Sequence, residues 1–155
     1  MRRKAASGKT GDEPLPAPLS LFYTGGAPVV PASPPGPPDP YRNLGYRIGL
    51  YARRIFESEL EALHARVQGR ASRDEKALAE GIAFGSGCNP QILGDGDLEV
   101  NEIRCIFMAG AKRIIITPSP LHIPAEALHN SQVYEDFAGW LLARDDKDLF
   151  EAKFG

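Results

Sequence analysis

The feature that most constrains the fold of this chain is a run of β-branched residues at 114–117, Ile-Ile-Ile-Thr. β-Branched side chains favour an extended backbone, and three consecutive isoleucines suit a strand that is covered on both faces. We therefore predict a buried strand over residues 112–117. Its composition is typical of a central strand in an α/β layer.

The residues ahead of this strand fit two structures. Four apolar residues recur at the spacing of one helical face, and Asp97 and Gly110 stand where a helix cap and a helix stop are expected, which favours a helix over 98–109. The alternative is a β-hairpin with arms 103–109 and 112–117, because the run Cys-Ile-Phe-Met also suits a buried strand. We favour the helix, since the connecting Ala-Gly-Ala lacks the Asn-Gly or Asp-Gly of a short hairpin turn. The four apolar residues are Val100, Ile103, Ile106 and Phe107.

Residues 1–40 differ in composition from the rest of the chain. They hold ten of the fourteen prolines, and no charged residue lies between Pro14 and Pro38. Such a segment cannot build a core of its own, although an extended peptide of this kind can carry apolar anchors into a partner's groove. The same composition is equally typical of a disordered tail. In the first interpretation the segment is an arm whose anchors are Leu21, Phe22, Tyr23, Val29 and Val30.

Local signals predict three further helices in the remaining chain: apolar periodicity predicts the first and the last, and a capping box of Ser72 and Glu75 predicts the second. Asp39 is placed to cap the first and longest of them, and Gly45 and Gly49 lie four residues apart inside it. Because glycine destabilises a helix interior, this pair predicts that another backbone passes close by. The three helices are expected at 41–68, 72–84 and 131–143.

These elements predict a mainly helical fold of the α+β or α/β class. We expect a single globular domain over 41–155, compact and helical around one buried strand at 112–117, preceded by the extended Pro-rich arm 1–40. A single strand needs a pairing partner. We expect arm segments 19–23 and 27–31, or another chain, to supply it.

The first predicted helix carries the best nucleic-acid candidate of the sequence. Arginines with an interleaved tyrosine can bind phosphates and stack on bases. However, the chain has a net charge of −2, and glutamates follow the arginines directly, which favours a solvated face or a protein interface. The candidate contact residues are Arg42, Tyr46, Arg47, Arg53 and Arg54.

An enzymatic site has one weak candidate. Cys88 lies in a Gly-rich loop, and His122 or His129 can serve as its base if the fold brings them together. An unreactive loop thiol is the simpler interpretation. The three histidines and two cysteines lack the paired spacing of a metal site, so we expect no metal and no cofactor.

Composition also bears on location and partners. The chain has no charge-free apolar stretch of membrane-spanning length, and its N-terminus lacks the apolar core of a signal peptide, so we expect a soluble cytoplasmic protein. Our first functional hypothesis is a non-enzymatic structural or interaction subunit of a larger protein assembly, which contacts other subunits through its arm and termini. The alternatives are a small nucleic-acid-binding protein that uses the arginines above, and, less favoured, an enzyme with a Cys88/His122 site.

Overall fold

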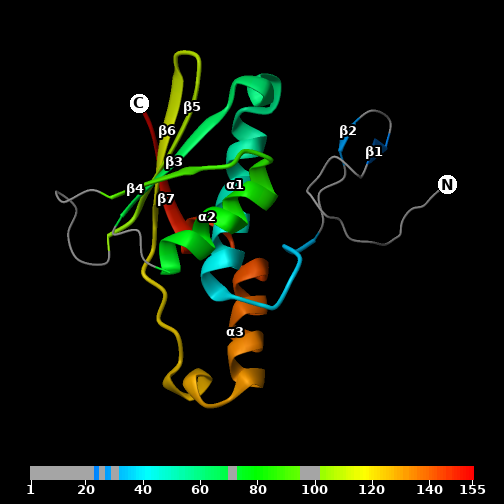
Figure 1. Ribbon diagram of the computed structural model, residues 1–155, viewed down its shortest axis with the longest axis vertical. Helices are drawn as coiled ribbons and strands as arrows, with labels where there is room; N and C mark the ends of the chain where they lie inside the picture. Colours follow the sequence, from blue (N-terminus) through cyan, green and yellow to red (C-terminus); the bar gives the residue numbers. More distant parts are fainter. Residues whose placement is uncertain (1–22, 25–26, 29–31, 70–72, 95–101) are drawn as a thin grey trace.

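A computed structural model describes residues 23–24, 27–28, 32–69, 73–94 and 102–155 of the chain (Figure 1). Three longer helices and a five-stranded sheet form its body, joined by short helical turns η2, η3 and α4. In chain order the elements of this body are α1 (Pro40–Ile55), η2 (Glu57–Ala62), β3 (His64–Gly69), α2 (Arg73–Ser86), β4 (Gln91–Gly94), β5 (Arg104–Ala109), β6 (Lys112–Pro118), η3 (Ala125–Leu128), α3 (Ser131–Ala143), α4 (Asp146–Leu149) and β7 (Phe150–Phe154).

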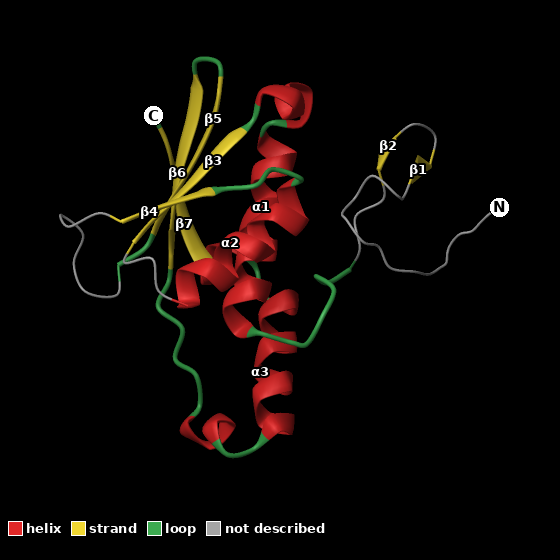
Figure 2. Ribbon diagram, in the orientation of Figure 1, coloured by secondary structure: helices red, strands yellow, loops and turns green. Residues whose placement is uncertain are grey.

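The sheet corrects the predicted fold class. The prediction of a mainly helical domain around one buried strand is wrong, because the strands form a mixed sheet in the order β4-β3-β5-β6-β7 (Figure 2). β3 and β4 are parallel and are connected through α2, whereas every other neighbouring pair is antiparallel. The strand predicted at 112–117 is confirmed as β6, which lies between β5 and β7, but the prediction that it is covered on both faces is wrong, because only Ile114 and Ile116 are buried and Ile115 on the other face is half-exposed.

The predicted helix over 98–109 is also wrong where the structure describes it. β5 and β6 form the hairpin that we had set aside, with Cys105 opposite Ile116 and Phe107 opposite Ile114. Gly110 opens the two-residue connection with a φ of 60°, so a glycine at the first turn position replaces the Asn-Gly signature. The proposed cap Asp97 lies outside the described residues.

The prediction of a long first helix over 41–68 is correct only in its first half. Asp39 caps α1 as predicted, and its Oδ1 accepts a 3.0 Å hydrogen bond from the backbone N–H of Arg42. The helix ends at Ile55, however, and residues 64–69 form β3, in which buried and exposed side chains alternate. The other two predicted helices are confirmed as α2 and α3, although the start expected for α2 at 72 lies outside the described residues.

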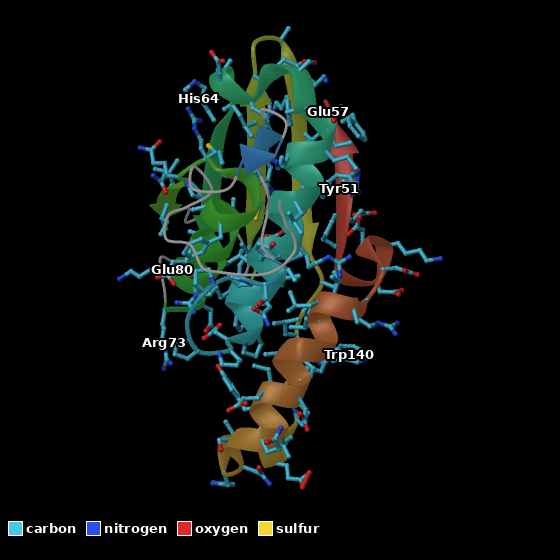
Figure 3. The ribbon with its side chains drawn as sticks, turned by 90° about the vertical axis from the view of Figure 1, so that its right-hand side faces the viewer. Tyr51, Glu57, His64, Arg73, Glu80 and Trp140 are labelled. Atoms are coloured by element: carbon cyan, nitrogen blue, oxygen red, sulfur yellow. The ribbon has the colours of Figure 1, made fainter. Side chains whose placement is uncertain are left out.

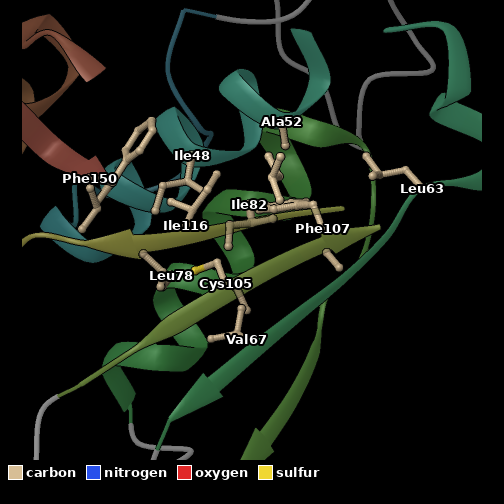
Figure 4. Packing of buried hydrophobic residues seen from close by; sticks show 14 of the residues in the cluster. Ile48, Ala52, Leu63, Val67, Leu78, Ile82, Cys105, Phe107, Ile116 and Phe150 are labelled. Carbon is tan, nitrogen blue, oxygen red and sulfur yellow. The ribbon is translucent and has the colours of Figure 1, made fainter. Parts of the chain in front are cut away.

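The hydrophobic core lies between the sheet and the pair α1 and α2 (Figure 4). The two helices approach each other closely enough that a Cβ atom added at Gly49 would stand 2.6 Å from the carbonyl oxygen of Ile82. Gly45, Gly81 and Gly85 likewise face backbone atoms of the opposite helix. This confirms the close backbone approach that the glycine spacing predicts.

The arm does not supply strands to the sheet in the described part of the chain. β1 (Tyr23–Thr24) and β2 (Ala27–Pro28) pair only with each other, as a separate two-stranded ladder. The pairing partners of β6 are instead β5 and β7, and β7 comes from the apolar end of the chain, where Phe150 is buried.

Candidate interaction surface

The helices that the structure describes cover one face of the sheet, and none of them lies on the other face (Figures 1 and 2). Residues at alternate positions of β3, β5 and β6 belong to the core shared with α1 and α2. Because side chains of a strand point alternately to its two faces, the residues between them lie on the opposite side. Figures 1 and 2 show α1 and α2 on one side of the sheet, and no described helix on the other. The core-facing strand residues are Ala65, Val67, Cys105, Phe107, Ile114 and Ile116.

We call this second surface the open face. The described strand residues of this face comprise four cations, one carboxylate, Glu151, and four apolar side chains. Its cations come from four different strands and are Arg66, Arg104, Arg113 and Lys153. Its apolar residues are Leu93, Ile106, Met108 and Ile115, and its other polar residues are His64, Gln68, Gln91 and Thr117.

The strand register orders these side chains into a row that crosses the whole sheet. Starting from β4, the row passes through two polar residues, then two isoleucines at its centre, and ends on a lysine. Ile106 is only 6% exposed, whereas Ile115 is half-buried. The open face therefore has an apolar centre with a cation on each side. In order, the row is Gln91, Arg66, Ile106, Ile115 and Lys153.

The four cations of the open face have no side-chain hydrogen bond and no ion pair within the part of the chain that the structure describes. Arg66, Arg113 and Lys153 are exposed, and Arg104 is half-exposed. Their charges are thus available to a ligand. A group of like charges around an apolar centre is typical of a surface that binds something of opposite charge.

In contrast, three of the four arginines predicted as contacts on the first helix form hydrogen bonds and ion pairs within the fold. Arg42 bonds Glu80 and the backbone carbonyls of Pro35 and Pro37, and Arg54 pairs with Asp146.

Two other residues of that predicted cluster, Arg47 and Tyr46, are largely shielded from solvent. Arg47 donates to the carbonyls of Leu141 and Leu142 at the end of α3 and to Asp146. Tyr46 is 1% exposed, and burial raises the pKa of its hydroxyl. A buried ring cannot stack on a base, so the predicted cluster does not form one stacking surface. Arg53 has no ion pair among the described residues.

The predicted arm anchors are described only in part. Tyr23 belongs to β1. Leu21, Phe22, Val29 and Val30 lie outside the described residues, and their role as anchors stays a prediction.

Cys88 lies in a hollow of about 340 Å³ at one corner of the open face. The histidine in this hollow is His64, which the sequence interpretation overlooked, and Arg66, Asn89 and Met108 also line it. His122 and His129 come from the segment around η3, and Figure 3 shows that segment at the end of the molecule opposite His64. The Cys88/His122 pair is therefore not brought together.

The thiol of Cys88 is not activated. Its Sγ donates a 3.2 Å hydrogen bond to the carbonyl of Leu63, and burial raises its pKa above the ordinary value. Since the thiolate is the nucleophilic form, a raised pKa lowers reactivity at neutral pH. Within the described residues there is also no group of three His, Cys, Asp or Glu side chains that could hold a metal ion.

Thiol labelling checks this description. We expect Cys88 to react with a disulfide reagent at pH 8 more slowly than a free thiol, and Cys105 to react only after unfolding, because Cys105 is fully buried with its pKa raised to about 12. Mass spectrometry of the native and the guanidinium-treated protein distinguishes the two sites. Labelling of native Cys88 faster than a free thiol would contradict this description and favour the enzymatic hypothesis.

Comparison with models of known protein families gives no match, and comparison with functionally curated proteins gives none either. In the described residues, no helix has the length and apolar character needed to cross a membrane.

Proposed function

We propose that this protein is a non-enzymatic interaction subunit of a larger protein assembly, and that a partner protein binds on its open face. The observation that carries this proposal is a sheet that the described helices cover on one face only, with four cations around an apolar centre on the other face that have no ion pair among the described residues. Sheets in stable domains are usually covered on the faces that carry apolar side chains, and Ile115 and Met108 remain half-exposed here. A partner that covers them would add a third layer to the helices and the sheet.

The arm is the second element of this proposal. Its proline-rich composition suits an extended segment that becomes ordered on a neighbouring subunit. We place the assembly in the cytoplasm, because Cys88 and Cys105 are both free thiols, as in proteins of a reducing compartment.

Nucleic acid is a second candidate for the same surface. The specific observation in its favour is that the four cations of the open face have no ion pair with any residue that the structure describes, since phosphate contacts need such groups. The net charge of −2 weighs against it, because the rest of the molecule then repels a polyanion.

Site-specific photo-crosslinking tests the proposal. A photoreactive phenylalanine analogue is placed at Ile115 on the open face and, as a control, at Lys76, an exposed residue of α2 on the opposite side of the molecule. In cells that naturally produce the protein, we expect a discrete protein adduct from position 115 and none from position 76. Failure to form any protein adduct at 115, or an adduct that digestion with nuclease removes, would overturn the proposal.

A further inference from the structure

We infer that the open face receives one amphipathic α-helix of a partner protein, whose apolar stripe is flanked by acidic residues. This inference rests on the proposed function and names the chemistry of the partner. It follows from the spacing, the charge and the side-chain types of the central row.

The spacing of the row fits a helix. Arg66 on β3 and Lys153 on β7 are separated by three strand intervals, with Ile106 and Ile115 between them. At about 4.8 Å per interval, the two cations stand roughly 14 Å apart. An α-helix with its side chains is about 10–12 Å across. A helix that lies along the strands can therefore rest on the half-buried Ile115 and close over the small exposed part of Ile106, with one cation beside each flank.

Two further cations lie on the same strands as the two isoleucines. Arg104 precedes Ile106 by two residues on β5, and Arg113 precedes Ile115 by two residues on β6. Because β5 and β6 are antiparallel, these two arginines lie toward opposite ends of the apolar centre. Cations thus surround the centre on both sides and at both ends. A partner helix with acidic residues on both sides of its apolar stripe would place a carboxylate beside each of these cations.

Other occupants fit less well. A second copy of the open face would place cations against cations. The arm of this chain has no charged residue between Pro14 and Pro38, so its apolar part cannot satisfy the four charges.

Single-stranded nucleic acid needs rings on which its bases stack. The phenylalanines of the strands lie on the core-facing side of the sheet. Phe107 and Phe154 are the register partners of Ile114 on the two neighbouring strands, and Ile114 belongs to the core. Among the described residues, the open face therefore carries no phenylalanine, tyrosine or tryptophan, and its one aromatic ring is the imidazole of His64 at the corner beside Cys88.

A designed peptide provides a direct test. The probe is an 18-residue helix with a leucine stripe flanked by glutamates, and it is compared with a scrambled peptide of the same composition, a peptide with lysines in place of the glutamates, and an 18-nucleotide oligothymidine. Binding is measured on the full chain by fluorescence anisotropy, and the site is located from the NMR methyl signals of Ile106 and Ile115. We expect the acidic helix to bind about ten-fold tighter than any of the three controls and to shift these two methyl signals.

Charge reversal provides the matched variants. Arg66→Glu with Lys153→Glu is expected to weaken binding of the acidic helix about ten-fold or more, whereas Lys76→Glu on the opposite side leaves it within about two-fold. Circular dichroism and the unfolding midpoint verify that each variant is folded. If the double reversal unfolds the protein, Arg66→Gln with Lys153→Gln replaces it, with a smaller loss expected in the same direction.

Three results would overturn the inference: equal binding of the scrambled peptide, tighter binding of oligothymidine, or signal shifts confined to residues away from the open face. These results are separable from a failure of the proposed function. A protein adduct at position 115 together with any of the three means that a partner binds there but is not an acidic helix. The absence of any protein adduct removes the proposed function itself.

Discussion

Gly45→Ala is expected to lower the free energy of unfolding by about 3 kcal/mol, at the upper end of the range for overpacked interiors. A Cβ atom at this position would fall against the carbonyl group of Leu78 on α2, and a backbone atom cannot rotate away as a side chain can. The two helices must therefore move apart, which loosens the core that they share with the sheet. Denaturation in urea, followed by circular dichroism, measures the loss.

Gly139→Ala is the matched control. Gly139 lies inside α3, and a Cβ atom there would have nothing within 4 Å. The same substitution is therefore expected to stabilise the protein by about 0.5–1 kcal/mol, because alanine favours the helix and glycine does not. If Gly45→Ala were as harmless as Gly139→Ala, α1 and α2 would not cross at backbone distance and the fold described above would need revision.

Arg47→Met is the second large effect, with an expected loss of about 2–3 kcal/mol. The side chain of Arg47 is 16% exposed, and its guanidinium donates to two carbonyls at the end of α3, at 3.1 and 3.0 Å, and to Asp146 at 2.8 Å. Methionine keeps most of the apolar stem and removes all three hydrogen bonds. Because these bonds attach α3 to α1, hydrogen exchange is expected to accelerate most in 131–143.

Arg54→Met is the control that distinguishes loss of the hydrogen bonds to α3 from loss of one positive charge beside Asp146. Arg54 bonds the other oxygen of the same Asp146 carboxylate, at 3.0 Å, but its side chain is 65% exposed. Exposed ion pairs contribute little, so we expect a loss of no more than about 0.5 kcal/mol. Equal losses in the two variants would show that Arg47 acts only through Asp146 and that the α3 carbonyls do not depend on it.

Helix starts were predictable because their signals are local. Asp39 followed by proline marks the beginning of α1, and the apolar spacing within 131–143 gives α3 its correct bounds. Each signal spans only a few residues, so no knowledge of the tertiary structure is needed.

β3 was not predicted because its apolar residues fit the spacing of a helix as well as that of a strand. Leu63 and Val67 lie four residues apart, as on a helix face, but with Ala65 they also alternate as in a strand, and all three are buried. Pairing with β4 and β5 decides between the two structures, and this pairing is not visible in the sequence. β5 was missed for a related reason, since its burial on both faces removes the alternation that identifies a strand.

The open face could not be predicted for a different reason. Its four cations are spread over almost ninety residues of sequence, from Arg66 to Lys153, and each one alone resembles an ordinary surface charge. Only the strand register makes them neighbours. The arginine cluster that is visible in the sequence serves mainly to hold α1 against α2, α3 and α4.

The two-residue connection between β5 and β6 sets an order for folding. A hairpin with so short a loop closes within microseconds, whereas pairing of β3 with β5 must first close a loop of more than thirty residues that contains α2. We therefore expect the hairpin to form first, with β3 docking on one side of it and β7 on the other. Until they dock, two strand edges of the hairpin are unpaired, and the edge of β6 stays so longest during synthesis because β7 is the last strand of the chain, which exposes that edge to pairing with other molecules.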